Sequence, residues 1–480
     1  MKTVAIIGGG FCGTLAAVNL ARLSSEPLRV ILINCQYPTA RGVAYGTRRG
    51  EHLLNVVARN MSAFPDLPSH FVDWLRTRTD FSDVPLAELR DQFMPRRIYG
   101  DYLQDLLFWH TQPLNGPGRV HIEVIDDEAI DLTPADWGAS VALKGGGTVQ
   151  AQRVLLATGN LAPTDILPAG SPKDHPAYSR NPWRGWQEKL PDSHEDVLLI
   201  GTGLTTIDVF LTLRSLGWQG KIHAISRNGL LPLSHFKGTD YAAFPPNEPW
   251  TLGLQKLKAE MESHCTKMRA DGLNPAVLVD KLRPFTQRIW RAFNVAEKQE
   301  FNRQLRTRWN VVRHRIAPAI AAQVDAATKD GSLNVIQGTI SAVQAEGPKL
   351  HVTMESGKGR PGQTLNVGLL VNCTGPRESF ANATEPLFRN LFQRGLIRAD
   401  ELDMGLDVTP DFAVVDRAGQ PSDFLYAVGP LLKGTLWETT AVPELRAQAH
   451  QIAQAFVADT EPGRADWMPM TPANLIEYCI

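Results

Sequence analysis

The sequence of 480 residues has almost no net charge and no long apolar run, and each absence excludes a class of protein. Its 49 lysines and arginines nearly balance 50 aspartates and glutamates, for a formal net charge of −1, which argues against nucleic acid as a partner. Asp208 and Arg214 interrupt the most apolar stretch, residues 197–216, so we expect no membrane span. An apolar strand begins at Val4, which leaves no room for a signal peptide.

Cysteine is also scarce. The five cysteines are scattered, and no two of them form a C-x-x-C pair, so we expect neither a metal site nor a dithiol relay. Few, scattered cysteines are typical of proteins in a reducing compartment, so we expect the protein to be cytoplasmic. The length predicts two or more domains, each with a core of its own.

The sequence does contain a glycine-rich turn in an informative setting. Residues 4–7 are an apolar run, the segment GGGFCG (residues 8–13) follows, and a helical pattern begins at once. A G-x-G-x-x-G match between a strand and a helix is the dinucleotide-binding fingerprint. Gly8 makes the tight turn, Gly10 lets a pyrophosphate approach the backbone, and Gly13 lets the helix pack closely on the strand. The phosphates would bind free N–H groups at the helix N-terminus.

The second strand departs from the fingerprint. The apolar run RVILI, residues 29–33, ends in Asn34, where an acidic residue for the ribose is expected. An asparagine can still hydrogen-bond a ribose hydroxyl, without charge.

The opening pattern recurs later in the chain. Residues 197–200 form a second apolar strand, followed by GTGLTT (residues 201–206), in which Thr206 replaces the third glycine. The next strand ends in Ser226-Arg227. A hydroxyl and an arginine there suit a ribose 2′-phosphate, which favours NADPH over NADH.

Both units also end alike. The runs VLLATGN (residues 154–160) and LLVNCTGP (residues 369–376) are apolar strands that close in Thr-Gly, which returns the chain to the nucleotide at the carboxyl edge of a sheet. We therefore predict an α/β fold of two nested, three-layer, Rossmann-like dinucleotide-binding domains. Residues 1–165 and 335–480 are assigned to the first domain and residues 183–334 to the second.

Between about residues 245 and 323 the pattern changes to basic amphipathic helices, predicted at residues 256–268, 276–291 and 297–308. We interpret this stretch as an all-helical insertion that hangs from the second unit. The run RWNVVRHR would place Arg308, His314 and Arg315 near one another, either in a binding site or at a solvated basic helix end.

The last recognisable element is FLYAVGP, residues 424–430, followed by a helix with Pro443 in its first turn. This arrangement predicts another helix N-terminus that faces the cofactor.

Together these landmarks resemble the two-dinucleotide-domain flavoproteins, in which the first fingerprint holds FAD and the second holds NAD(P)H. More narrowly, several segments resemble the FAD-NAD(P)-binding protein family of bacterial flavoproteins. They are GVAYGTRRGEHLLNV (42–56), NMSAFPDLPSHFVDWL (60–75), PRRIYGDYL (95–103), SRNGLLP (226–232), VVRHRIAP (311–318) and GTLWETTAVPELRAQ (434–448). The resemblance implies FAD and NADPH as cofactors, but this family has no single assigned activity.

Two departures from better-known flavoproteins are visible. The strand that usually ends in Gly-Asp near the flavin ends here in Gly429-Pro430, and the F-x-G-x-x-x-H-x-x-x-W signature of Baeyer–Villiger monooxygenases is absent.

The motifs and the resemblance together define the candidate site. Cofactor contacts are predicted at Gly8, Gly10, Phe11, Cys12, Gly13, Asn34, Asn55, Met61, Ser62, Thr158, Gly159, Gly201, Gly203, Thr205, Ser226, Arg227, Thr374, Gly375, Gly429, Thr440, Ala441 and Val442. The catalytic candidates are His52, Asn55, Arg97 and His314. Two alternatives stay open, a structural salt bridge for Arg97 and a satisfied core or flavin-edge histidine for His52.

With both nucleotides on one chain, NADPH can reduce the flavin directly, and without C-x-x-C the electrons are expected to reach molecular oxygen. The architecture resembles the N-hydroxylating monooxygenases, which implies a small amine or amino acid as substrate. Two alternatives remain: an NADPH dehydrogenase that passes electrons to a quinone or a partner protein, and a non-catalytic FAD-binding redox sensor.

Overall fold

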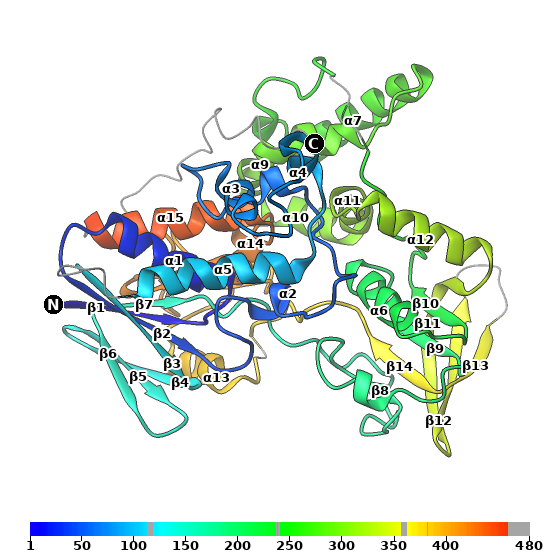
Figure 1. Cartoon of the computed structure of the whole chain (residues 1–480), viewed down its shortest axis with the longest axis horizontal. Coiled ribbons are helices and arrows are strands. Elements are labelled where there is room, and N and C mark those ends of the chain that lie inside the picture. Colours follow the sequence, from blue (N-terminus) through cyan, green and yellow to red (C-terminus); the bar gives the residue numbers. More distant parts are fainter. Residues whose placement is uncertain (113–118, 237, 239–240, 357–361, 382, 459–480) are drawn as a thin grey trace.

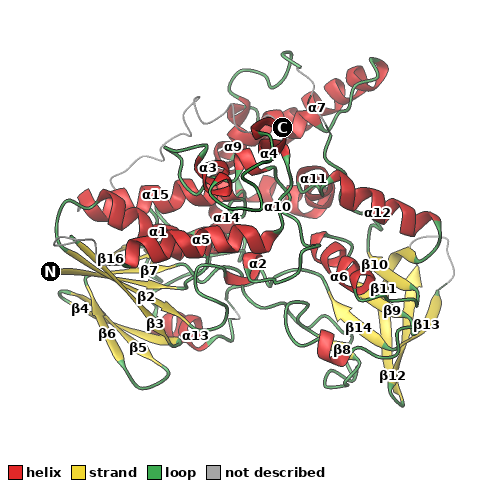
Figure 2. Ribbon diagram, in the orientation of Figure 1, coloured by secondary structure: helices red, strands yellow, loops and turns green. Residues whose placement is uncertain are grey.

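The structure is a computed structural model, and it describes residues 1–112, 119–236, 238, 241–356, 362–381 and 383–458. Two sheets lie side by side, each covered by helices, and further helices bridge them (Figures 1 and 2). Within the described residues, no helix has both the length and the apolar character of a membrane span.

The first sheet has six strands in the order β15-β16-β7-β1-β2-β3, all parallel except for the β15–β16 pair. Its strands are β1 (Lys2–Ile7), β2 (Leu28–Asn34), β3 (Val120–Asp126), β7 (Arg153–Leu156), β15 (Ala413–Val415) and β16 (Pro421–Ala427). The central strands β1, β2 and β7 are largely buried apolar runs, as parallel strands covered on both faces should be. The chain leaves this sheet after β7 and returns to it only at β15, with the whole second sheet in between, which confirms the predicted nesting.

Helices α1 (Phe11–Leu23), α5 (Arg96–Thr111) and α15 (Val442–Ala458) lie together on one face of the first sheet. On the other face lies a small antiparallel sheet of β4 (Ala129–Ala135), β5 (Gly138–Leu143) and β6 (Thr148–Ala151) (Figure 1). The unit therefore has three layers, as predicted. Its peripheral helices are α2 (Gly42–Tyr45), α3 (His70–Arg76), α4 (Leu86–Asp91), α13 (Pro386–Arg394), α14 (Lys433–Leu436) and the 3₁₀ turns Ala58–Asn60 and Gly429–Leu432.

The second sheet has the order β13-β12-β11-β10-β9-β14-β8, with a parallel part from β8 to β11 and an antiparallel part beyond it. Its strands are β8 (Tyr178–Ser179), β9 (Val197–Ile200), β10 (Ile222–Ser226), β11 (Leu333–Glu346), β12 (Lys349–Ser356), β13 (Gln363–Val367) and β14 (Leu369–Asn372). The 3₁₀ turn Gln187–Lys189 precedes β9, and helix α6 (Leu204–Ser215) follows β9. This topology corrects the predicted boundary at residue 335. Residues 333–372 pair with the second sheet, because β11 and β14 continue it on either side of the β9–β10 pair.

The described part of the insertion is helical, but two of the predicted helices are broken. The helix expected at 276–291 is α8 (Val277–Leu282), a 3₁₀ turn (Arg283–Phe285) and α9 (Thr286–Ala292), because Pro284 cannot donate a helical hydrogen bond. The helix expected at 297–308 is instead α10 (Val295–Gln304) and the start of α11 (Arg306–Arg313). The remaining elements are the 3₁₀ turn Pro249–Thr251, α7 (Gly253–Ala270) and α12 (Pro318–Lys329).

The packing of the insertion differs from the prediction that it hangs from the second unit. Its helices α7 to α10 share one hydrophobic core with Met404 and Trp437, which belong to the returning part of the first unit. Its last helix, α12, packs instead into the core of the second sheet. The insertion therefore starts and ends in the second unit but closes over the first.

Candidate functional site

The first glycine turn is shaped by close backbone contacts. Gly8 has a φ of +110°, and a Cβ there would lie 2.4 Å from the carbonyl oxygen of Ala157. A Cβ on Gly13 would lie 1.9 Å from the carbonyl oxygen of Gly8. Only glycine fits at both positions, so the turn, helix α1 and the strand that ends in Ala157-Thr158-Gly159 are packed against one another.

Gly10 is different, because it faces open space. A Cβ there would meet only the Cα of Gly42, at 3.7 Å. Gly10 caps α1 without a side-chain hydrogen bond, and the first turn of α1 has no acidic residue, so its N–H groups can bind an anion. Beside this turn, the buried Oγ1 of Thr158 has no hydrogen-bond partner among the described residues. The arrangement fits the pyrophosphate and ribose of a dinucleotide.

Asn34 already has partners in the protein. Its Oδ1 accepts a hydrogen bond from the N–H of Gly9 at 3.2 Å. Its Nδ2 donates to the carbonyl of Tyr37 at 2.8 Å and to Thr39 at 3.1 Å. The side chain therefore fastens the glycine turn to the loop after β2, and a ribose hydroxyl could reach only the remaining lone pair of Oδ1.

The closing segment meets the first turn from the other side. A Cβ on Gly429 would lie 2.9 Å from the sulfur of Cys12. The N–H of Gly429 donates to Gln448 at 2.8 Å, and the hydroxyl of Thr439 donates to the carbonyl of Gly429 at 2.8 Å. Burial raises the pKa of the Cys12 thiol to about 12, so this cysteine is a packing residue rather than a thiolate. Thr440, Ala441 and Val442 follow directly at the start of α15.

The second glycine turn repeats this geometry with one change. Gly201 has a φ of +117°, and a Cβ there would lie 2.7 Å from the carbonyl oxygen of Cys373. Gly203 has open space beside it and caps α6 without a side-chain hydrogen bond. Where the first unit has Gly13, the hydroxyl of Thr206 donates to the carbonyl of Gly201 at 2.8 Å. Thr206 thus replaces a close packing contact with a hydrogen bond.

The end of β10 shows which group is available for a 2′-phosphate. The hydroxyl of Ser226 lies 2.9 Å from that of Thr202 and accepts from the N–H of Gly229, so it is already used to hold the loop. Arg227 is exposed, and no described residue pairs with its guanidinium. Thr374 hydrogen-bonds Asn372 within its own loop. Thr205 lies in the first turn of α6, and Gly375 lies in the loop that returns after β14.

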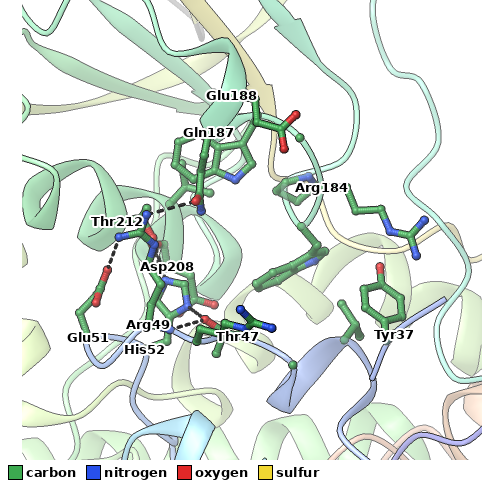
Figure 3. Close-up of a pocket in the computed structure, with 18 of the residues that line it drawn as sticks. Tyr37, Thr47, Arg49, Glu51, His52, Arg184, Gln187, Glu188, Asp208 and Thr212 are labelled. Atoms are coloured by element: carbon green, nitrogen blue, oxygen red, sulfur yellow. Dashed lines mark hydrogen bonds and ion pairs between the residues drawn. The ribbon is translucent and has the colours of Figure 1, made fainter. Parts of the chain in front are cut away.

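A cavity of about 690 Å³ lies between the two units (Figure 3). Its walls are the segment 46–52, the linker 182–188 and one side of α6. Figure 3 shows Arg49 near Glu51 and Gln187 on one side, with Arg184 beside Tyr37 on the other.

His52 lies in the wall of this cavity and joins the two units. Its Nδ1 lies 2.9 Å from the hydroxyl of Thr47, and its Nε2 lies 2.9 Å from Thr212 and 3.1 Å from the carbonyl of Asp208. Beside it, Arg96 forms an ion pair with Asp208 at 2.7 Å. Burial lowers the pKa of His52. Both ring nitrogens of this neutral imidazole already have hydrogen-bond partners in the protein. His52 therefore fits a role in joining the two units better than a role as a catalytic base.

A second polar centre lies where the insertion meets the closing segment. Arg283 contacts Glu444 at 3.2 Å, and Arg313 contacts Glu438 at 3.2 Å, with all four side chains at most 8% exposed. Burial works to raise the pKa of Glu438, but the guanidinium of Arg313 and its neighbours outweigh it and hold this pKa below its usual value. Two carboxylates and two guanidinium groups thus balance one another in a buried site. Trp437, beside Glu438, has a φ of +61°, a strained conformation of the kind found at functional sites.

Two histidines flank this centre. The Nε2 of His235 lies 2.7 Å from the carbonyl oxygen of Asn55, while its buried Nδ1 has no partner among the described residues. His314 ends α11, next to Arg313. Burial lowers the pKa of each of these two histidines to about 4. Both are therefore neutral at pH 7, and the bond to Asn55 leaves Nδ1 of His235 as an acceptor.

The structure separates the four catalytic candidates. Asn55 and His314 lie in the neighbourhood of His235, because the N–H of His235 donates to the carbonyl of Ile316 at 3.0 Å. His52 lies at the junction between the units, and Arg97 is exposed on α5. The salt bridge considered for Arg97 is formed by its neighbour Arg96 instead.

Three further residues, Met61, Ser62 and Phe11, were predicted to contact the cofactor. Met61 is buried, and the hydroxyl of Ser62 donates to the carbonyl of Leu67 at 2.6 Å, while its carbonyl accepts from Arg446 at 3.0 Å. Phe11 is buried at the start of α1. Of the expected cluster in residues 308–315, Arg308 is exposed, whereas Arg315 is buried and pairs with Asp280 at 2.9 Å.

The sequence prediction missed His235, Glu438, Glu444, Arg283 and Arg313. Only proximity across the fold unites them, since they come from the loop after β10, the insertion and the closing segment. The one available signal was that Arg313, Glu438 and Glu444 fall inside the long family-like segments. Within the described residues, no group of histidine, cysteine and acidic side chains could hold a metal ion.

Comparisons with known proteins agree with this geometry. Residues 5–161 match the model of the FAD-NAD(P)-binding family. No curated protein matches the sequence.

Among solved structures, similar folds include an ornithine N-hydroxylase from Kutzneria sp. 744, with a TM-score of 0.63, 17% identity, and coverage of 95% of this chain and 98% of that one. An L-lysine 6-monooxygenase from Pseudomonas syringae has a TM-score of 0.64 and 17% identity, covering 96% of this chain and 100% of that one. A bacillithiol disulfide reductase from Bacillus cereus has a TM-score of 0.53 and 13% identity, covering 96% of this chain and 99% of that one. At these identities the likeness shows the fold, which is that of two-dinucleotide-domain flavoproteins.

Proposed function

We propose that this chain, whose amino-terminal region belongs to the FAD-NAD(P)-binding family, is an FAD-dependent NADPH oxidoreductase, and specifically a single-component monooxygenase that N-hydroxylates a small amine or amino acid. Molecular oxygen is the second substrate. We place the protein in the cytoplasm, where its cysteines stay reduced.

The observation that carries the proposal is the pair of open glycine turns on two parallel sheets of one chain. Gly10 and Gly203 each cap a helix without a side-chain hydrogen bond, and neither helix has an acidic residue in its first turn. Each turn is an anion site with positive helix-dipole character. Two such sites allow one dinucleotide to reduce the other without a partner protein.

FAD, when bound, supplies the redox chemistry. The protein would hold it with the N–H groups after Gly10 and with the hydroxyl of Thr158, which has no hydrogen-bond partner among the described residues. NADPH would lie on the second turn, with Arg227 against its 2′-phosphate.

The polar centre beneath the insertion suits an amine substrate. N-hydroxylation needs a nitrogen with a free lone pair, so a site for it should accept an N–H hydrogen bond in a place that excludes water. The Nδ1 of His235 is a buried acceptor without a partner among the described residues, and its pKa of about 4 keeps it neutral. We propose that it orients the amine, with His314 and Asn55 beside it.

One observation favours a reductase as the second candidate, namely the fold similarity to bacillithiol disulfide reductases. Against a thiol-based relay, Cys12 and Cys373 are buried, and burial raises the pKa of both. A reductase here would therefore pass electrons from the flavin directly to a quinone, a disulfide or a partner protein.

The test is a screen of the purified, FAD-loaded protein for NADPH consumption against a panel of amines and amino acids, with oxygen uptake recorded in parallel. The proposal predicts that one class of amine stimulates both NADPH and oxygen use. NADPH use that responds to quinones or disulfides but not to amines would favour the reductase. No turnover with any acceptor would favour the redox sensor.

A further inference from the structure

A second, smaller cavity lies outside both dinucleotide turns. It has a volume of about 320 Å³ and lies between one side of α5 and the segment 38–48. From α5 it is lined by Arg97, Asp101 and Gln104, which are spaced along one face of the helix. From the facing segment it is lined by Pro38, Arg41, Gly46, Thr47 and Arg48.

The charges in this cavity do not balance. Arg41 is neutralised by an ion pair with Asp101, and it also donates to the carbonyl oxygen of Arg97 at 3.1 Å. In the part of the chain that the structure describes, no residue pairs with the guanidinium groups of Arg48 and Arg97. The first turn of α5 has no acidic residue either. Arg48 and Arg97, both exposed, therefore add two positive charges to the lining of one small cavity, and among the described residues neither has a counter-charge of its own.

We propose that this cavity binds a phosphate group, either free phosphate or the phosphate of a small monoester. A phosphate monoester carries a charge of about −1.5 to −2 at pH 7, which matches the two uncompensated guanidinium groups. Guanidinium donors bind phosphate oxygens in pairs. The volume of about 320 Å³ is at the lower end of ordinary ligand cavities, so there is room for an organic group beyond the phosphate.

The position of the cavity links it to the cofactor turn. Gly46, Thr47 and Arg48 line both this cavity and the larger one between the units. The same segment is fastened to the glycine turn, since the N–H of Ala40 donates to the carbonyl of Gly9 at 2.7 Å. A phosphate held by Arg48 and Arg97 would therefore stabilise the segment that covers the first glycine turn. The proposal does not depend on which substrate the protein oxidises.

The test is titration calorimetry of FAD-loaded protein at low ionic strength, in a buffer without phosphate, with inorganic phosphate, glycerol 3-phosphate and glycerol as probes. We expect about one equivalent of either phosphate compound to bind, and glycerol not to bind. Tighter binding of glycerol 3-phosphate would identify a monoester as the ligand, and equal affinity would identify free phosphate. Arg48→Gln and Arg97→Gln should each weaken binding about tenfold or more, as the loss of one charge-assisted hydrogen bond predicts.

Two controls separate this cavity from other sites. Arg90→Gln removes an exposed arginine of α4 that lines neither cavity, and it should leave the affinity unchanged. Arg227→Ala tests whether phosphate binds at the predicted NADPH site instead, and it too should leave the affinity unchanged. An absence of binding to wild-type protein, equal affinity in the Arg48 and Arg97 variants, or a loss confined to Arg227→Ala would each overturn the proposal.

Discussion

Arg96 of α5 and Asp208 of α6 form an ion pair of 2.7 Å that joins the two dinucleotide-binding units, and only 12% and 6% of the two side chains are exposed. The carbonyl of Asp208 also lies within hydrogen-bond distance of His52. The relative placement of the two units therefore depends on a few buried polar contacts beside a cavity.

We expect Asp208→Asn to destabilise the protein by about 3 kcal/mol, because breaking a buried pair leaves one charge uncompensated. NADPH should also reduce the flavin more slowly in this variant. Thermal unfolding measures the change in stability, and the rate of flavin reduction by NADPH measures the change in hydride transfer. Together with Arg96→Gln and the double variant, Asp208→Asn forms a double-mutant cycle. If the two substitutions changed the free energy of unfolding additively, the two residues would not interact.

Gly10→Ala should release FAD without unfolding the protein. A Cβ at Gly10 meets only the Cα of Gly42, at 3.7 Å, so the protein itself can accommodate it, but it would occupy the space of a pyrophosphate. Flavin absorbance after gel filtration, with circular dichroism for the fold, checks this prediction. The matched variant is Gly13→Ala, whose Cβ would lie 1.9 Å from a carbonyl oxygen and which should unfold or misfold. Full flavin content in Gly10→Ala would contradict the assignment of this turn.

Arg227→Ala should weaken NADPH binding by roughly 1.5–3 kcal/mol, or about ten- to a hundredfold, as expected for a lost charge-assisted hydrogen bond. NADH has no 2′-phosphate, so its affinity is the internal control and should not change. Flavin reduction at varied concentrations of each nucleotide measures both. Equal weakening of the two would show that Arg227 is structural.

Stability should fall as the solution becomes acidic, because His235 and His314 are buried in the neutral form. Their folded pKa of about 4 lies below the ordinary value of about 6.5. The unfolded chain therefore binds more protons between these two values. The contribution of the two histidines to the free energy of unfolding decreases as the pH falls from about 6.5 to about 4, and it is constant above about 6.5.

The magnitude is on the order of 3 kcal/mol for each histidine, because one pKa unit corresponds to about 1.4 kcal/mol. Urea unfolding at several pH values measures it, and His314→Gln should make the dependence shallower. The exposed His121 provides the control His121→Gln, which should leave the slope as in wild-type protein.

Much of the fold follows from local patterns. The two glycine turns, the strands that close in Thr-Gly and the final helix α15 all lie where sequence spacing predicts them, because each depends on adjacent residues and on hydrophobic periodicity. The domain boundary at 335 was wrong, since the strand pairing of β11 and β14 is a long-range property. The break at Pro284 is also a local property, because proline cannot donate a helical hydrogen bond, and the predicted helix should have ended there.

The candidate site was less accessible from sequence. Nothing local to His235 predicts that its Nε2 reaches Asn55, which is 180 positions away. Glu438 pairs with Arg313 of α11, and Glu444 pairs with Arg283 after α8. These pairs form because the helices of the insertion share a core with Trp437 of the first unit, which is a long-range property. By contrast, Arg96 and Arg97 are adjacent in sequence, but Arg96 forms an ion pair with Asp208 of α6, whereas Arg97 is exposed at the edge of the smaller cavity.

The most direct test of the proposed function is the ratio of hydroxylamine product to NADPH consumed and oxygen taken up, measured with an amine that stimulates turnover. We predict one hydroxylamine formed per NADPH and per oxygen, with little peroxide, because the polar centre beneath the insertion is buried and a buried site protects a reactive intermediate from water. NADPH oxidation without hydroxylamine, together with rapid electron delivery to a quinone under anaerobic conditions, would contradict it.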